Sequence, residues 1–300
     1  GITTSQVVPS YSYNTVDHPI TPSRGKSIYL SVGFAGGPLK GTVNTLEPQV
    51  DLKYFRSGFK RGHVIGGHFL GRMITGFGGK TAPPFNRYYM GGENDIRGFQ
   101  IWEISPFAYI PSVASINVLN NDGSPRQQKQ LNSDGTATFT PVTQNIPVYQ
   151  MILPGGDTQV LTNLEYRIPI FGPVTLAAFM DAGVNRLSRP GQLKINESRI
   201  RELNNLFPEA AFEPQARILK DSQVIRSSTG LELQVLMPVV NAPFRFYWAY
   251  NPTILNTTLQ APIVTDRSYF PNAATFANAV VNYLPQRYFE RRSTFRFSIG

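Results

Sequence analysis

The sequence predicts an all-β fold, an antiparallel transmembrane β-barrel with a short helical insertion in an exterior loop. Three features of the 300 residues support this prediction: segments of strand length alternate between apolar and polar residues, charges lie near strand centres, and short connections alternate with long ones. The 20 Phe, 14 Tyr, 26 Gly and 24 Pro are typical of strands and turns. No apolar run approaches the roughly 20 residues of a spanning helix, which excludes a helical membrane protein.

Nine segments are expected to be strands, namely residues 5–13, 27–35, 46–55, 64–77, 158–168, 174–183, 226–236, 244–250 and 293–300. In the second segment Ile28, Leu30 and Val32 share one face, whereas Tyr29 and Ser31 share the other. This period of two fits a strand between lipid and a polar lumen. The matching apolar faces of later segments are Val50, Leu52 and Tyr54; Ile65, Phe69, Met73 and Phe77; Thr162, Leu164, Tyr166 and Ile168; Val174, Leu176, Ala178 and Met180; Leu231, Leu233 and Val235; Phe244, Phe246, Trp248 and Tyr250; and Phe295, Phe297 and Ile299.

Charged residues lie on the opposite face of these segments, near strand centres. They are Arg72, Glu165, Arg167, Glu232, Arg245 and Arg296. A soluble β-sandwich also alternates and would place such charges in water, whereas a barrel would place them in its lumen. Both arrangements are allowed, and we favour the barrel.

The connections between the segments have unequal lengths. Residues 56–63, 169–172 and 238–243 form short turns, which we expect on the periplasmic side; residues 78–158, 185–225 and 252–292 form long exterior loops. Within the second long loop, residues 192–221 carry apolar residues at helical spacing, and Asn196-Glu197-Ser198 is a possible helix start. We expect this helix to pack over the barrel mouth rather than to bind a partner.

Several functional classes are not supported by the composition. The net charge is 28 − 19 = +9, but the basic residues do not form one patch, so no nucleic-acid partner is expected. The absence of cysteine removes disulfides and thiolate zinc sites. His18, His63 and His68 form no ligand cluster and no Ser-His-Asp arrangement. We therefore expect no metal, no cofactor and no enzymatic activity.

The most informative stretch is residues 88–99, which contains Gly91-Gly92 and Ile96-Arg97-Gly98-Phe99. A buried-core interpretation fails, because the glycines break regular structure and a buried Arg97 needs a partner. A phosphate-binding loop is also excluded, because no Lys-Ser/Thr follows the glycines. Asp181 lies on the inward face of a predicted strand whose outer face is apolar, so this carboxylate needs a counterion.

Residues 88–99 resemble the signature loop of the Omp85 family, outer-membrane barrels that insert or translocate other proteins. In that family a loop carrying Ile/Val-Arg-Gly-Phe folds back into the barrel, and glycines such as Gly91 and Gly92 let it turn. Its arginine pairs with acidic groups on the inner wall. The alternative for Arg97 is an ordinary solvated loop arginine.

Two wall motifs also resemble family positions. One is Phe179-Met180-Asp181-Ala182-Gly183 at a strand end, and the other places Glu165 between Leu164 and Tyr166. The resemblance implies that Arg97 reaches Asp181 and Glu165, with its planar fork bidentate to one of them. It also implies that Phe179 packs against the guanidinium face.

Three further motifs occur in family order. Residues 14–25 resemble a Pro/Gly turn before a strand, and residues 237–246 resemble the penultimate hairpin. Phe295, Phe297 and Ile299 resemble the alternating terminal strand that acts as an assembly signal. The usual final aromatic residue is absent, which we interpret as truncation.

The resemblance implies that residues 1–300 are the C-terminal nine or so strands of a sixteen-stranded barrel in the bacterial outer membrane. Periplasmic POTRA domains and the first strands are expected to be missing. The implied function is insertion and folding of nascent β-barrel proteins through a lateral seam between first and last strands, without covalent chemistry. Implied partners are the bilayer, nascent outer-membrane proteins and accessory lipoproteins of an assembly complex.

Two alternatives remain. The first is a family member that works as a secretion pore or as a translocation and assembly module, which shares the loop motif. The second is a passive porin or a barrel enzyme such as an outer-membrane phospholipase. A porin should lack inward acids matched to a loop arginine, and the enzyme would need a lipid-facing Ser-His pair that is not found.

Overall fold

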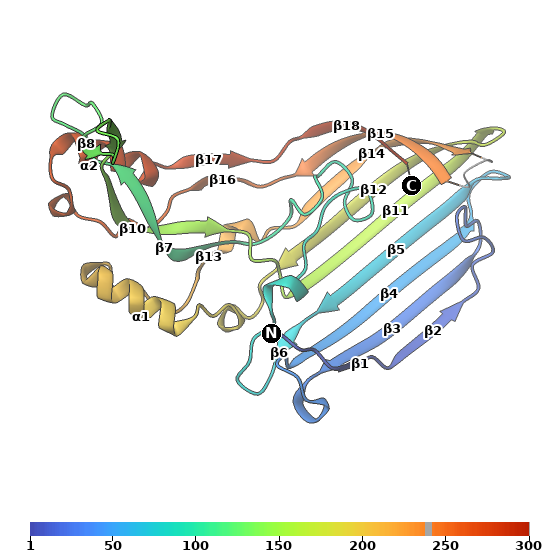
Figure 1. The fold of residues 1–300 in the computed structure, drawn as a ribbon. Coiled ribbons are helices and arrows are strands. Elements are labelled where there is room, and N and C mark those ends of the chain that lie inside the picture. The colour runs from blue at the N-terminus through green and yellow to red at the C-terminus, as the bar shows by residue number, and fades with distance from the viewer. Residues whose placement is uncertain (238–241, 300) are drawn as a thin grey trace.

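The computed structural model describes residues 1–237 and 242–299 and consists mainly of one large antiparallel sheet (Figure 1). The sheet has the order β1-β3-β4-β5-β11-β12-β14-β15-β18, with β2 beside β3 and β6 beside β4. Its strands are β1 (Gln6–Val7), β2 (Ser10–Asn14), β3 (Gly25–Ala35), β4 (Thr45–Ser57), β5 (Val64–Met73), β6 (Thr75–Gly76), β11 (Thr158–Phe171), β12 (Val174–Arg186), β14 (Arg226–Met237), β15 (Ala242–Thr253) and β18 (Ser293–Ile299). Of the turn expected over 238–243, residues 238–241 lie outside the described residues, as does the terminal Gly300.

All nine predicted strands are confirmed. The first is split into β1 and β2, and the fourth into β5 and β6. The sheet curves (Figure 1), but β1, β2 and β18 are edges of it, so the described residues form an open wall rather than a closed cylinder.

The two faces of the wall differ as the alternation predicts. Along β12, Ala178 and Met180 are exposed, whereas Ala177, Phe179 and Asp181 are buried on the concave side. Large apolar side chains are exposed on the outer face because lipid, rather than water, is the medium that such a face requires. The outer face includes Leu30, Val32, Val50, Leu52, Tyr54, Phe69, Val160, Leu164, Met180, Leu231, Leu233, Phe246, Trp248, Tyr250, Phe295 and Phe297.

The long loops build a second region beyond one end of the wall, at the left of Figure 1. It contains the sheet β10 (Thr143–Ile152)-β7 (Phe107–Asn117)-β13 (Arg217–Leu219), the hairpins β8 (Gln127–Leu131)/β9 (Ala137–Pro141) and β16 (Asn256–Leu259)/β17 (Gln286–Phe289), and helices α1 (Glu197–Leu206) and α2 (Ala273–Val280). The sequence did not predict these strands or α2. Short 3-10 turns complete the structure at Gly37–Leu39, Pro84–Asn86, Pro190–Gln192, Pro208–Ala210, Lys220–Ser222, Arg267–Tyr269 and Val281–Tyr283.

The predicted helix is present but much shorter than expected. Asn196 caps it by accepting a hydrogen bond from the Ser198 backbone N–H, and Pro208 prevents its continuation beyond Leu206. Its buried Ile200 and Leu203 belong to the same apolar cluster as Tyr109 of β7 and Tyr149 of β10. The helix therefore packs on the exterior sheet, whose strands the sequence did not reveal. Its place over the barrel mouth stays a prediction, because the described residues form an open wall.

Neither α1 nor α2, nor any other helix in the described part of the chain, is long and apolar enough to cross a bilayer. This finding does not bear on crossing by strands.

Candidate functional site

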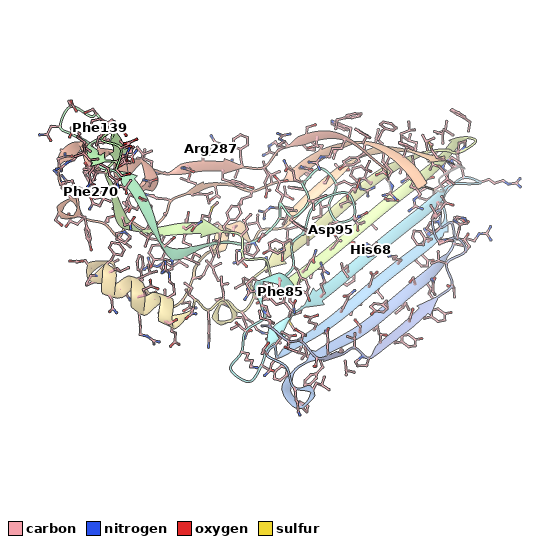
Figure 2. All side chains as sticks on the ribbon, in the orientation of Figure 1. His68, Phe85, Asp95, Phe139, Phe270 and Arg287 are labelled. Atoms are coloured by element: carbon pink, nitrogen blue, oxygen red, sulfur yellow. The ribbon has the colours of Figure 1, made fainter. Side chains whose placement is uncertain are left out.

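The loop after β6 runs over the concave face of the wall, where Figure 2 labels Asp95 of the loop and His68 of β5. Its neck is closed by reciprocal backbone hydrogen bonds, 3.1 Å from Met90 N to Ile104 O and 2.9 Å from Ile104 N to Met90 O. Gly91 and Gly92 have φ values of 118° and 96°, which favour glycine. The chain can therefore reverse within a few residues and enter the concavity.

Apolar packing fixes the loop against the wall. Met90, Ile96, Phe99 and Ile104 form one buried cluster with Leu161, which projects inward from β11. Burying Ile96 and Phe99 on either side of Arg97 stabilises the loop by roughly 1.5–3 kcal/mol per large side chain. The arginine is consequently held at the wall by its sequence neighbours as well as by its own charge.

Arg97 meets two predicted carboxylates and a third that was not predicted. Its Nε and Nη2 atoms donate to Asp181 Oδ2 and Oδ1, both at 2.8 Å, in a bidentate pair. Its Nη1 atom donates to Glu165 Oε1 at 2.8 Å and to Glu232 Oε2 at 3.0 Å. Arg97 is 4% exposed and Asp181 is 0% exposed, so these charge-assisted hydrogen bonds are protected from water.

The guanidinium also lies over an aromatic ring. The Arg97 Cζ atom is 3.8 Å from the Phe179 ring centroid, the geometry of a cation–π contact. Tyr247 of β15 meets Phe179 edge-on, with ring centroids 6.3 Å apart. Stacking was expected for Phe179, whereas the Tyr247 contact was not.

Glu232 was identified from the sequence as an inward charge but was not connected with Arg97. Strand register explains the contact: Phe179 pairs with Glu165 of β11 and with Gly230 of β14, and Glu232 follows Gly230 on the same face. Without the strand register, the sequence cannot show that Glu232 of β14 lies beside Arg97. The inward parity of Glu232 was the only signal, and it was shared by five other charged residues.

The cluster is balanced in charge. Glu165 also accepts from Arg167 Nε at 2.8 Å, and Glu232 lies 3.8 Å from Arg245 Nε. Three carboxylates thus face three guanidiniums. Because an unpaired buried charge is costly, each member depends on the others, and the arrangement can hold a loop against the wall.

A hydrogen-bonded chain continues from the cluster into the wall. Asn163 Nδ2 donates to Asp181 Oδ1 at 2.9 Å and to the Asp95 carbonyl at 2.7 Å. The Asn163 amide oxygen lies 3.0 Å from His68 Nδ1, and His68 Nε2 lies 3.1 Å from Asp51 Oδ1. The chain crosses β12, β11, β5 and β4, so the loop contacts wall residues well beyond its own partners.

The loop also contacts the last strand. The Gly98 carbonyl accepts hydrogen bonds from Thr294 Oγ1 of β18 at 3.0 Å and from Asn251 Nδ2 of β15 at 3.3 Å. Gly98 has φ 88°, and a Cβ atom there would collide with Asn251 Oδ1. Arg97 and Gly98 therefore connect the loop with five neighbouring strands, β11, β12, β14, β15 and β18.

Gly183 and the terminal aromatics occupy the remaining predicted positions. A Cβ atom on Gly183 would lie 2.8 Å from Val160 O and 2.9 Å from Met90 Sδ, so glycine lets the loop neck approach β12. Phe295 and Phe297 are 71% and 67% exposed, on the outer face of β18 rather than on the face that meets the loop. Ile299 pairs with Phe244 at the end of β18, and its side chain lies outside the described residues.

Comparisons with known proteins agree with this architecture. Residues 2–300 match the Omp85 superfamily domain. The chain is 25% identical over 178 residues, 58% of its length and 17% of the relative's, to the outer membrane protein assembly factor BamA of Nitratidesulfovibrio vulgaris. The crystal structure of BamA from Haemophilus ducreyi lacking POTRA domains 1–3 shares the fold, with a TM-score of 0.52 and 16% identity over 98% of this chain and 42% of that one.

The chain spans less than half the length of these two relatives. The family match, by contrast, covers almost every residue described above, including the Arg97 loop, the wall strands and β18. The curved antiparallel sheet with an apolar outer face is the architecture expected of a barrel wall. The chain belongs to the Omp85 superfamily and forms part of an integral outer-membrane β-barrel.

Proposed function

We propose that this chain is the C-terminal wall of an outer-membrane assembly factor that inserts and folds nascent β-barrel proteins. The relative named as an assembly factor supports this function over simple permeation. The observation that carries the proposal is the Arg97 cluster, because a passive pore has no need for a loop fixed to carboxylates of three wall strands. The proposal involves no covalent chemistry, and its partners are the bilayer, unfolded client barrels and accessory lipoproteins.

The proposed exit for clients is a seam at the last strand. β18 pairs with β15 only over 244–250, whereas β11 and β12 pair over most of their lengths. A short terminal ladder is easier to separate, and a separated edge offers backbone groups to an incoming strand. β18 is therefore the part of this wall best suited to exchange partners.

The Arg97 loop supports the seam from inside. Arg97 is fixed to β11, β12 and β14, while the next residue accepts a hydrogen bond from Thr294 of β18. Movement of β18 away from the wall breaks that bond but leaves the Arg97 cluster intact. In this proposal the cluster is a fixed point and the Gly98 carbonyl is a releasable contact.

Insertion of an unfolded client barrel into liposomes that contain the full-length protein tests the proposal. We expect Arg97→Ala to reduce insertion at least tenfold, and Arg199→Ala, which removes an exposed arginine of α1, to leave it unchanged. A disulfide between β18 and the first strand of the full-length barrel should also stop insertion until it is reduced; the 300 residues contain no competing cysteine.

The same liposomes separate the alternative within the family. A secretion or translocation pore would move a soluble passenger into the vesicle lumen without inserting it into the bilayer. If the soluble passenger became protected inside the vesicles and no client was inserted into the bilayer, the function would be translocation rather than assembly. Full insertion by Arg97→Ala would contradict the role given to the loop.

A further inference from the structure

The lipid-facing side of the wall carries a basic cleft that the assembly function does not use. The cleft has a volume of about 500 Å³ and is lined by Arg186, Lys220, Asp221, Gln223, Val224 and Ile225. It lies between the end of β12 at Arg186 and the start of β14 at Arg226. We propose that this cleft binds the phosphate group of an anionic lipid in the outer leaflet.

The orientation of Arg186 supports a lipid ligand. Exposure alternates along β12, so that Ala178, Met180 and Arg186 are exposed while Asp181 and Asn185 are buried on the concave side. Arg186 therefore projects from the same face as the apolar residues that meet lipid. Val184 and Met180, below it on this face, provide an apolar surface on which an acyl chain can lie.

The depth of Arg186 corresponds to a lipid headgroup. β12 has 13 residues and starts directly after the short periplasmic turn at Gly172. At about 3.3 Å per residue and a tilt of about 40°, its far end rises roughly 30 Å along the membrane normal. The apolar band of such barrels is about 25 Å tall, so the guanidinium lies just above the hydrocarbon, at the level of lipid phosphates.

The cations of the cleft are available to a ligand. Arg186 Nε donates to the Gln223 carbonyl at 3.2 Å, which fixes the side chain at the cleft. In the described part of the chain neither Arg186 nor Lys220 forms a salt bridge, although Asp221 lines the same cleft. The cleft thus carries two positive side chains and one negative, a net charge of 2 − 1 = +1.

Apolar neighbours favour a lipid over a free anion. Val224 and Ile225 are 42% and 55% exposed beside the two cations. Burying them against acyl chains is favourable, whereas a soluble anion would leave them in contact with water. The matching outer positions at the ends of β11 and β14 are Thr158 and Ser227, which carry no charge. Neither of these two neighbouring strand ends therefore repeats the charge that Arg186 brings to the end of β12.

Lipid retention by the full-length protein in detergent micelles, measured by native mass spectrometry, tests the site. Phosphatidic acid presents a phosphate on acyl chains, phosphatidylcholine a zwitterionic headgroup, and inorganic phosphate the anion alone. Each cation near an anionic lipid contributes about a fivefold gain in affinity, so Arg186→Gln with Lys220→Gln should weaken phosphatidic acid binding by about 25-fold. Binding of phosphatidylcholine should not change.

Control variants define the outcomes. Arg189→Gln removes a nearby exposed cation outside the cleft and should retain phosphatidic acid, as should the charge-preserving pair Arg186→Lys and Lys220→Arg. Lys220→Gln alone lies in an exposed turn, so its expected fivefold loss does not depend on barrel folding. Three results would overturn the proposal. The double Gln variant could retain as much phosphatidic acid as wild type, Arg189→Gln could lose as much as the double variant, or inorganic phosphate could displace the lipid at matched concentration. Because no client is present, none of these results depends on the assembly function.

Discussion

Arg97 and Arg226, two of the three arginines that are buried in the described residues, join loops to the rest of this molecule and are held differently. Arg97 enters the concavity of the wall and meets three carboxylates from three strands. Arg226, at the start of β14, meets Glu290 as its one carboxylate among the described residues, at 3.0–3.1 Å, and the carbonyls of Ser222 and Val224. Both Arg226 and Glu290 are 1% exposed as side chains. Burial alone therefore does not distinguish the two arginines, whereas the number and the origin of their partners do.

The two pairs also join different parts of the fold. The Arg97 cluster connects a loop with the transmembrane wall, so its loss changes the lumen. The Arg226–Glu290 pair connects the base of the exterior loops, because Glu290 also accepts from the Leu255 backbone N–H near β16. We expect the first to control barrel stability and assembly, and the second to control only the exterior region.

Removal of Arg97 should have the largest effect. Arg97→Ala leaves Asp181, Glu165 and Glu232 without their shared cation, and breaking such a buried cluster costs about 3–5 kcal/mol. Urea unfolding of the full-length protein in detergent, followed by tryptophan fluorescence, measures the loss. Arg199→Ala on the surface of α1 should shift the unfolding midpoint by less than a tenth as much; an equal shift would remove the distinction between buried and exposed arginines.

Glu290→Gln should have the next largest effect, and this effect should be confined to the exterior region. It removes the carboxylate with which Arg226 forms its salt bridge and costs about 3 kcal/mol locally. Limited proteolysis should show faster cleavage in 254–292, while client insertion stays within twofold of wild type. Glu202→Gln, an exposed change in α1, is the control. A loss of insertion equal to that of Arg97→Ala would show that the exterior pair is as central as the wall cluster.

Gly183→Ala tests how closely the loop neck approaches β12. The added methyl would meet Val160 O and Met90 Sδ below 3 Å, and overpacking of this kind costs about 1–3 kcal/mol. Gly191→Ala is the matched control, because nothing lies within 4 Å of its added Cβ atom. Equal unfolding midpoints for the two variants would mean that the neck can move away from the wall.

Thr294→Val should produce the smallest effect. It removes the hydroxyl that donates to the Gly98 carbonyl, a neutral hydrogen bond that contributes about 0.5–1.5 kcal/mol. If this contact is released when β18 moves, client insertion should become slightly faster while the unfolding midpoint falls slightly. Thr140→Val on the exposed β9 should change neither. Slower insertion by Thr294→Val would argue against a releasable contact.

The wall could be predicted from the sequence because lipid and lumen impose a period of two on every strand. Leu164 outside and Glu165 inside already define both faces of β11. The exterior region could not be predicted in this way: β7 is buried on both faces over Phe107–Tyr109, and β8 and β9 are exposed on both, so neither alternates.

The candidate site was predictable in part for a similar reason. The family motif pointed to Arg97, Asp181, Glu165 and Phe179, which the structure brings together. Glu232 and Tyr247 required the register between β12, β14 and β15, which no local pattern encodes. The pairing of Arg226 with Glu290 had no motif at all, because the two residues are 64 positions apart, one at the start of β14 and the other between β17 and β18.

A double-mutant cycle on Arg97 and Asp181 in the full-length protein tests most directly whether the wall carboxylates hold the loop arginine. The quantity measured is the free energy of unfolding. Because the two side chains form a bidentate pair, the double variant should lose about 2–3 kcal/mol less stability than the sum of the losses of Arg97→Ala and Asp181→Ala. Losses that simply add, with a coupling energy near zero, would contradict the claim that the wall carboxylates hold the loop arginine.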